Sequence, residues 1–372
     1  MASEMLYPVI PIYLKEIGFS VFLIGVLEGM AEFTAGLSKG YFGKRSDEKG
    51  LRLPFVKSGY VLSTLSKPMM AFFTFPLWIF FVRTIDRLGK GLRTAARDAL
   101  LSQNATPQTK GRVFAFHRGL DTTGAVLGPA VALIFLHFFP HHYTQLFYWA
   151  FIPGLFAIAL IFLLKEKRTE RTTLKRGSFF SFFTYWKIAS PEYKKLITGL
   201  LLFALFNSSD VFLLLKTKEI TGSDTITIVA YIFYNIVYAL ASYPMGVLAD
   251  KVGLKKVYVS GLALFALVYS LFGFSHSPYL IFIAFFCYGL YGATTEGIAK
   301  AWITNVAEEK NVATAVGFYT SCQSICSLAA SAFAGFLWAS FSGSVTFIVT
   351  ACMAFLLLFY FRIMPYRPVL HQ

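Results

Sequence analysis

Long apolar runs, separated by short polar turns, dominate the chain from residue 19 onward. A membrane-spanning helix needs about 20 consecutive apolar residues, and most of these runs reach that length. The first half of the chain contains predicted spans at 19–42, 55–74, 76–97, 112–138 and 144–164. The second half contains predicted spans at 196–217, 225–248, 255–274, 277–302, 312–339 and 343–364. The pattern predicts an all-α polytopic membrane protein.

A basic segment, 165–195, interrupts this pattern near the middle of the chain. We expect it to link an N-terminal half, 1–164, to a C-terminal half, 196–372. Aromatic residues around 179–186 predict a short amphipathic helix that lies at the membrane interface.

The opening stretch, 1–14, is too short to cross a membrane, and Pro8 and Pro11 interrupt it. Ser3-Glu4 resembles Ser209-Asp210, which lies deep in the predicted span 196–217. We therefore expect Glu4 to lie deep in a first span whose opening residues are absent, because the true start is upstream or the chain is truncated. The expected architecture is about eleven full spans plus a partial one.

Composition and charge agree with this class of protein. The chain is 56% hydrophobic and 14% charged, with a mean hydropathy of +0.61, whereas a soluble chain carries about 25% charged residues. The net charge of +15 comes from Lys and Arg in the turns 43–54, 98–112, 165–195 and 250–256. Under the positive-inside rule, the connector and the C-terminus are cytoplasmic and the protein lies in the inner or plasma membrane. Because the charge is dispersed over short turns, we expect no nucleic-acid partner.

No pattern in the sequence predicts a metal site, a cofactor or an enzyme. Cys287, Cys322, Cys326 and Cys352 all lie in apolar runs, without the His or further Cys that a metal site needs, and are expected to be packing residues. The sequence also lacks the metalloprotease, serine hydrolase and nucleotide-binding motifs at a membrane face.

Two copies of one polar hairpin follow the spans 19–42 and 225–248. In each copy Gly, Asp, Gly and a basic residue have the same spacing. The first copy consists of Gly43, Asp47, Gly50 and Arg52, and the second, 203 positions later, consists of Gly246, Asp250, Gly253, Lys255 and Lys256. The repeated hairpin indicates an internally duplicated membrane protein.

The hairpins, the basic connector and the six-plus-six layout resemble the major facilitator superfamily of secondary transporters over essentially the whole chain. The second hairpin matches the family pattern G-x-L-A-D-x-x-G-x-K/R-K/R throughout, whereas the first has Arg45 and Ser46 where Leu and Ala are usual. Residues 83–91 look like the family's fourth-span motif. Gly124, Gly128 and Pro129 match its fifth-span helix-packing motif, G-x-x-x-G-P.

This resemblance implies two pseudo-symmetric six-helix bundles and secondary active transport of a small organic solute by alternating access. The fifth-span motif is associated with exporters that exchange substrate for protons, and residues 86–101 resemble a bacterial branch of drug or metabolite permeases. The resemblance therefore implies proton-coupled efflux (antiport) by a monomer whose partners are the solute, protons and the lipid bilayer. A proton- or ion-coupled importer of a metabolite or chelate, and a non-transporting truncated member, are the alternatives.

The hairpin carboxylates of Asp47 and Asp250 are candidate gating groups. We expect contacts that hold in one state and break in the other, made by capping a neighbouring helix N-terminus or by pairing with Arg87, Arg93 or Arg97. The simpler interpretation is a tight polar turn.

Ionisable residues inside the spans are candidates for substrate and proton binding, because each costs about 2.5–3.5 kcal/mol at mid-span. The candidates are Glu4, Glu28, Glu32, Arg83, Asp86, Arg118, Asp121, Asp210 and Glu296. The resemblance places Glu4, Arg83, Asp210 and Glu296 on cavity-lining spans.

Ion pairing within a helix is the competing role for some of these residues. Arg118 with Asp121, and Glu296 with Lys300, have the spacing of pairs on one helix face. Asp210, Glu28 and Glu32 lack an obvious partner and are expected to bind protons.

Two other features have a structural and a functional interpretation. Tyr231, Tyr234 and Tyr238 recur at helical spacing and either line a pocket for an amphiphilic substrate, face lipid or pack between helices. Lys67 is expected to extend its amine toward the membrane surface.

Overall fold

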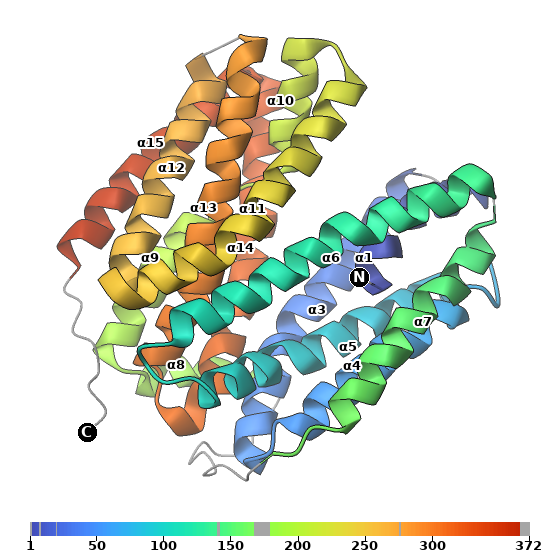
Figure 1. Ribbon diagram of the computed structural model, residues 1–372, viewed down its shortest axis with the longest axis horizontal. Helices are drawn as coiled ribbons and strands as arrows, with labels where there is room; N and C mark the ends of the chain where they lie inside the picture. Colours follow the sequence, from blue (N-terminus) through green and yellow to red (C-terminus); the bar gives the residue numbers. More distant parts are fainter. Residues whose placement is uncertain are drawn as a thin grey trace. The chain divides into compact units, whose positions relative to one another are not determined.

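The computed structural model describes residues 2–6, 9–19, 21–139, 142–166, 179–274 and 277–364, apart from the side chains at 11, 12, 15, 21–26, 28–32, 224, 225, 228 and 278. Within these ranges the chain forms helices and no strand (Figure 1). Seven of the described helices are long and apolar enough to cross a membrane. The fold is therefore that of an all-helical membrane protein.

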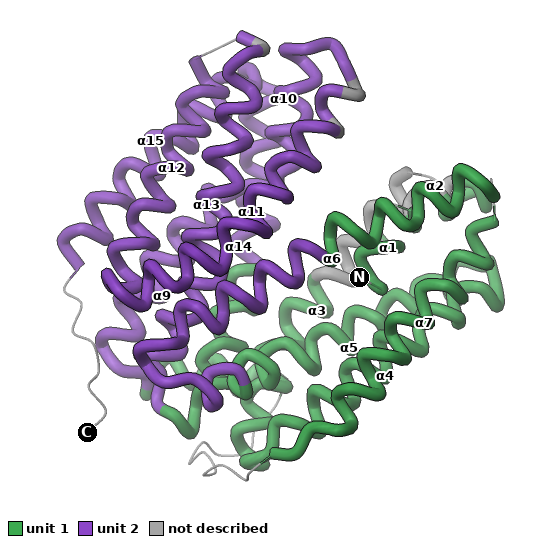
Figure 2. The backbone as a smooth tube through the Cα atoms, in the orientation of Figure 1, with its two compact units in different colours: residues 1–100, 124–188, 309–324 green, residues 101–123, 189–308, 325–372 purple. Residues whose placement is uncertain are grey.

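The chain divides into two compact units (Figure 2). Unit 1 comprises 1–100, 124–188 and 309–324, and unit 2 comprises 101–123, 189–308 and 325–372. Each unit thus contains a segment from the other half of the sequence. The helices α6 (Lys110–Phe138) and α14 (Val312–Ser340) each contribute to both units.

Unit 1 is built mainly from the first half of the chain. Its helices are α1 (Ala2–Leu6), α2 (Val9–Glu16), α3 (Val21–Lys49), α4 (Leu53–Met69), α5 (Pro76–Gln103), α7 (Tyr143–Phe162), α8 (Tyr185–Ile188) and the 3₁₀ segments η1 (Phe179–Thr184) and η2 (Glu309–Asn311). The helices α1 and α2 contribute Leu6 and Leu14 to a buried core with Ile79 of α5 and Phe147 of α7. The short N-terminal helices are therefore packed parts of this unit.

Unit 2 contains α9 (Pro191–Ala204), α10 (Val211–Thr221), α11 (Asp224–Val252), α12 (Leu254–Phe274), α13 (Pro278–Val306) and α15 (Gly343–Ile363). Ser190, Ser223 and Ser342 cap α9, α11 and α15, since each hydroxyl accepts a hydrogen bond from a backbone N–H three residues later. The helix α12 packs against both α13 and α15, with Phe265, Trp302 and Phe361 buried. The serine caps set where these helices begin.

The surfaces of several helices are apolar. Phe156 and Leu160 on α7, and Leu356 and Phe359 on α15, are each about half exposed or more. In water such surfaces would be unfavourable, but they suit contact with lipid chains.

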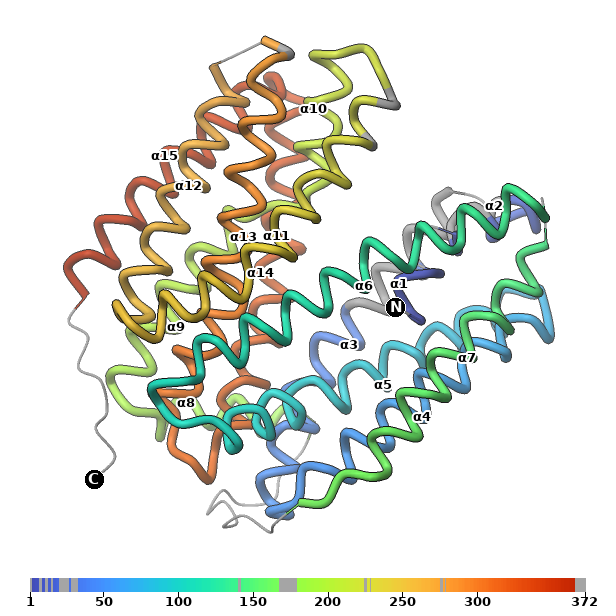
Figure 3. The backbone as a smooth tube through the Cα atoms, in the orientation of Figure 1, coloured from blue at the N-terminus to red at the C-terminus, as the bar shows by residue number. Residues whose placement is uncertain are grey.

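The predicted spans other than 196–217 each coincide with a single helix. The span 196–217 was expected to be continuous, and the structure corrects this: α9 ends at Ala204 and α10 begins at Val211 (Figure 3). Asn207, Ser208, Ser209 and Asp210 lie between the two helices, and such side chains compete with the helix for backbone hydrogen bonds. Ser209 Oγ accepts a bond of this kind from Val211 N–H at 3.4 Å.

The hairpins also differ from the prediction, which placed the first at 43–54. The helix α3 continues through Asp47 to Lys49, and α11 continues through Asp250 to Val252. The chain turns at Gly50 and Gly253, whose φ values of 62° and 104° are favourable only for glycine. Both carboxylates therefore lie in the last turn of a long helix.

Candidate functional site

The carboxylate of Asp47 caps the first turn of α14. Its Oδ2 accepts hydrogen bonds from the backbone N–H of Thr314 at 2.7 Å and from the Thr314 hydroxyl at 2.8 Å. Arg52 Nη2 lies 3.5 Å from Asp47 Oδ1 and donates to the carbonyl of Glu309 at 3.2 Å. The N–H groups in the first turn of a helix have no partner within the helix, so this carboxylate satisfies one of them.

Asp47 lies beyond the apolar part of α3 and its side chain is fully buried. Burial raises the pKa of Asp47 to about 6, although Arg52 and the Thr314 donors favour the ionised form. The contact therefore holds a carboxylate whose desolvation is only partly compensated.

The second hairpin makes the equivalent contact. Asp250 accepts hydrogen bonds from the backbone N–H of Gly111 at 2.7 Å and of Arg112 at 3.0 Å, in the first turn of α6. The Arg112 guanidinium also lies 3.6 Å from Asp250. Lys255 donates to the carbonyls of Arg362 and Met364 at the end of α15.

The first glycine of each hairpin allows this close approach. A Cβ atom at Gly43 would lie 2.4 Å from the carbonyl oxygen of Ala313, and one at Gly246 would lie 2.5 Å from Ala115 Cβ. Any larger residue would push the capped helix away from the carboxylate. The Gly and Asp of the motif therefore act together.

The two contacts are related by the internal repeat. Asp47 and Asp250 are 203 positions apart, and so are the residues that they cap, Gly111 and Thr314. Each carboxylate belongs to one half of the sequence and caps a helix from the other half. The two copies of the hairpin thus make the same contact in reciprocal directions.

Asp210 lies in the interruption between α9 and α10 and is bonded by two tyrosines. Tyr234 of α11 donates to Asp210 Oδ2 at 2.8 Å, and Tyr288 of α13 donates to Oδ1 at 2.6 Å. Asn207 donates to the hydroxyl of Tyr291 at 3.1 Å. The tyrosine rings contact one another, with centroids 5.3 Å apart both for Tyr234 with Tyr288 and for Tyr288 with Tyr291.

Arg118 of α6 is paired with Glu296 of α13, and its Nε donates to the hydroxyl of Tyr238 on α11 at 2.7 Å. Arg118 and Glu296, for which pairing within a helix was the competing role, thus form an ion pair between helices. Asp121 lies 3.7 Å from His117 Nδ1. Helical spacing identifies residues that share a face, but it cannot show partners on a neighbouring helix.

The fourth-span motif contains a buried charge cluster. Lys67 is 4% exposed, and its amine lies 2.6 Å from the Asp86 carboxylate. Ser63 donates to the same oxygen of Asp86 at 2.6 Å, and Arg83 lies 3.9 Å from the other. Lys67 was expected to reach the membrane surface, and that expectation was wrong because Asp86 offers a buried counter-ion.

The other residues singled out from the sequence lie on α1, α3, α6 and α12. Glu4 is half-buried on α1. Glu28 and Glu32 lie on α3, but their side chains are outside the described residues. Gly128 is buried on α6, where Gly124 and Pro129 are half-buried, and Lys256 is exposed.

Several residues of these sites were not singled out from the sequence, among them Asn207, Thr314, Tyr288 and Tyr291. Thr314, Tyr288 and Tyr291 carry no signal of their own, because only the contact with a distant segment gives them a role. Asn207 does carry one. A run of four poor helix formers, 207–210, in an apolar span indicates an interrupted helix.

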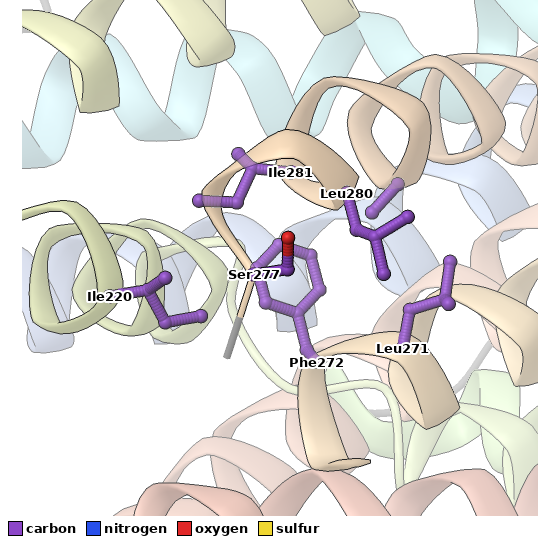
Figure 4. A pocket seen from close by; sticks show the side chains of 7 residues that line it. Ile220, Leu271, Phe272, Ser277, Leu280 and Ile281 are labelled. Carbon is purple, nitrogen blue, oxygen red and sulfur yellow. The ribbon is translucent and has the colours of Figure 1, made fainter. Parts of the chain in front are cut away.

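A small cavity lies between α10, α12 and the start of α13 (Figure 4). Its volume is about 10 Å³, which is room for about one water molecule. It is lined by Ile220, Leu271, Phe272, Ser277, Leu280, Ile281 and Ala284. The size and apolar lining exclude it as a binding site for an organic solute.

Long apolar helices, charged residues buried between them and a broken helix with an acidic residue are features of membrane transport proteins. A sequence model of the Major Facilitator Superfamily matches residues 1–234 and 196–371. The chain belongs to the Major Facilitator Superfamily and is a multi-pass membrane transporter of that family.

One curated relative is a transporter of the same type, and another matches part of the chain. An uncharacterised MFS-type transporter from Methanocaldococcus jannaschii is 31% identical over 95% of this chain and 89% of its own. An uncharacterised protein of Mycobacterium tuberculosis is 29% identical, over 41% of this chain and 38% of its own.

Two solved transporters share the fold at low sequence identity. The human organic anion transporter MFSD10 has a TM-score of 0.78 and 14% identity, covering 97% of this chain and 95% of its own. The fucose:proton symporter FucP of E. coli has a TM-score of 0.77 and 12% identity, and the match covers 98% of this chain and 95% of the FucP chain. At this level of identity the likeness concerns the fold alone.

Proposed function

We propose that this chain moves a small organic solute by alternating access between two six-helix halves, in proton-coupled efflux (antiport). The observation that carries the proposal is the reciprocal pair of caps made by Asp47 and Asp250. Each contact joins the two halves of the sequence through a few hydrogen bonds to a helix N-terminus. Such contacts suit a gate that closes in one state and opens in the other.

Proton coupling is assigned to Asp210. As a carboxylate it accepts O–H bonds from Tyr234 on α11 and Tyr288 on α13. Protonation makes one carboxyl oxygen an O–H donor, so the tyrosine at that oxygen must turn its own O–H away and accept the bond instead. On this proposal, binding a proton rearranges the connection of Asp210 to α11 or to α13, which links protonation to helix movement.

Arg118 and Glu296 complete the proposed polar path. Their side chains are 39% and 47% exposed although both helices are apolar. Such a pair can separate when a charged or polar solute offers either partner a replacement. On this proposal the hairpins and the connector face the cytoplasm, and the protein resides in the inner or plasma membrane.

The test is solute flux in proteoliposomes under an imposed pH gradient, with a panel of organic cations, anions and sugars. We expect solute to move opposite to the proton, and Asp210→Asn to abolish gradient-driven accumulation while leaving slow exchange. Glu192→Gln is the control, because Glu192 is an exposed acid in the first turn of α9, on the other side of the same interruption. Flux in the direction of the proton would make the chain an importer. A wild-type rate of accumulation in Asp210→Asn would remove Asp210 from coupling.

A further inference from the structure

The interruption between α9 and α10 contains oxygen atoms that proton binding does not use. Ser208 is 5% exposed, and its Oγ faces the hydroxyl of Tyr269, which is 1% exposed and interacts electrostatically with Asp210. Neither oxygen has a further hydrogen-bond partner among the described residues, so Ser208 Oγ keeps a lone pair for a ligand. Asn207 donates its amide N–H to Tyr291 and has an amide oxygen left to accept or coordinate.

The backbone adds acceptors at the same place. The helix α9 ends at Ala204, and its last carbonyl groups give that end a partial negative charge. Residues 205–210 are not helical; the carbonyls of Ser209 and Asp210 accept from Phe212 and Leu214, which leaves the carbonyl oxygens of 205–208 for contacts outside a helix. Interrupted helices of this kind coordinate small cations in transporters.

The two tyrosines that bond Asp210 lie well inside apolar helices long enough to cross a membrane. Tyr234 is the eleventh residue of α11 and Tyr288 the eleventh of α13, counting from Asp224 and Pro278. At 1.5 Å per residue, both are about 15 Å from the N-terminal ends of their helices, and half of a hydrocarbon core of about 30 Å has the same length. A charged group here needs a counter-charge.

The charge of the site selects the ion. Asp210 is its one carboxylate, and the described part of the chain contains no group of three His, Cys, Asp or Glu residues that could hold a divalent metal. Carboxylate, hydroxyl, amide and carbonyl oxygens are hard ligands without affinity for soft metals. One negative charge among neutral oxygens matches a monovalent alkali cation.

We propose that this interruption binds Na⁺, with Asp210, Ser208 and Asn207 as its side-chain ligands. The inference rests on the proposed function, because Na⁺ and the coupling proton would compete for Asp210. Neutral oxygens add little to proton binding but are essential for an alkali cation, so they distinguish the two ions.

The experiment uses the full chain in lipid nanodiscs, with ²²Na⁺ binding and thermal unfolding measured in NaCl, KCl and choline chloride at equal ionic strength. We expect saturable ²²Na⁺ binding and an unfolding temperature that rises with Na⁺ alone. Asp210→Asn should abolish both effects. Ser208→Ala should raise the half-saturating Na⁺ concentration about tenfold, the loss expected for one neutral ligand.

Ser209→Ala is the matched control, because Ser209 is exposed and its backbone N–H is bonded to Ser331. It should bind Na⁺ as the wild type does, and lowering the pH should weaken Na⁺ binding. Equal behaviour of the wild type in the three salts would overturn the inference, whatever the variants do. Flux driven by a pH gradient without ²²Na⁺ binding would refute the sodium site and leave the proposed function standing. Na⁺ binding without solute flux under any gradient would support the sodium site and refute the proposed function.

Discussion

At the scale of single residues, a few side chains act through partners that are distant in sequence. Asp47 reaches Thr314, and Asp210 is bonded by Tyr234 and Tyr288. The acids could be found in the sequence because a charge in or beside an apolar span is conspicuous. Their partners could not, because threonine and tyrosine are common in helices and only the packing of helices brings them to the acid.

We expect Asp47→Ala to weaken the contact with α14 by about 1–2 kcal/mol, because it leaves the Thr314 N–H without an acceptor. Asp47→Asn keeps an acceptor oxygen and should therefore reduce the stability less than Asp47→Ala does. Thermal unfolding in detergent measures the stability, and flux in proteoliposomes measures the effect on gating. If Asp47→Ala has the unfolding temperature and the solute flux of the wild type, the cap has no role in stability or gating.

The equivalent change in the second hairpin, Asp250→Asn, tests the gating role directly. Its Oδ atoms accept from two backbone N–H groups, whereas an amide side chain offers one acceptor oxygen. We therefore expect a changed transport rate together with a nearly native fold. Lys251→Gln in the same turn is the control, since Lys251 is exposed. Unaltered transport in Asp250→Asn would exclude the hairpins as gates.

At the scale of elements, the apolar pattern predicted nearly all helix positions, since the length and periodicity of apolar runs are local properties. The interruption of the span 196–217 was not predicted. Most of that span is as apolar as the other spans, and the poor helix formers at 207–210 occupy only a few positions. Pairing between elements was less predictable still. Lys67 and Arg118 both bind acids on other helices, and the sequence alone does not give which helices are neighbours.

The Lys67–Asp86 pair that joins α4 to α5 gives a prediction at this scale. We expect Lys67→Met or Asp86→Leu alone to destabilise the protein by about 3–5 kcal/mol, because each leaves a buried charge without its partner. The double variant should lose much less stability than the sum of the losses in the two single variants. Thermal unfolding of all four proteins in a double-mutant cycle measures the coupling. Additive losses would mean that the pair is not coupled.

At the scale of the whole molecule, alternating access requires contacts between the two sequence halves to break during transport. A Cβ atom on Gly36 of α3 would lie 2.7 Å from Ser324 Cβ on α14, and disulfides need about 3.8 Å, so a small shift would allow a bond. In a chain whose four native cysteines are replaced, Gly36→Cys with Ser324→Cys should therefore cross-link on oxidation. We expect oxidation to stop solute flux and reduction to restore it. Flux that continues in the cross-linked protein would rule out separation of α3 from α14.

The reciprocal caps have a consequence for the origin of this chain. Where two identical subunits meet across a twofold axis, residue i of one meets residue j of the other, and j meets i. Asp47 is equivalent to Asp250 in the internal repeat, and Gly111 is equivalent to Thr314, because each pair is 203 positions apart. The contacts of Asp47 with Thr314 and of Asp250 with Gly111 therefore obey this rule. A half-length ancestor with one such hairpin could therefore have worked as a homodimer before its gene was duplicated and fused. After the fusion, a mutation in one half no longer appeared in the other half, so each half had to accommodate changes that it did not share.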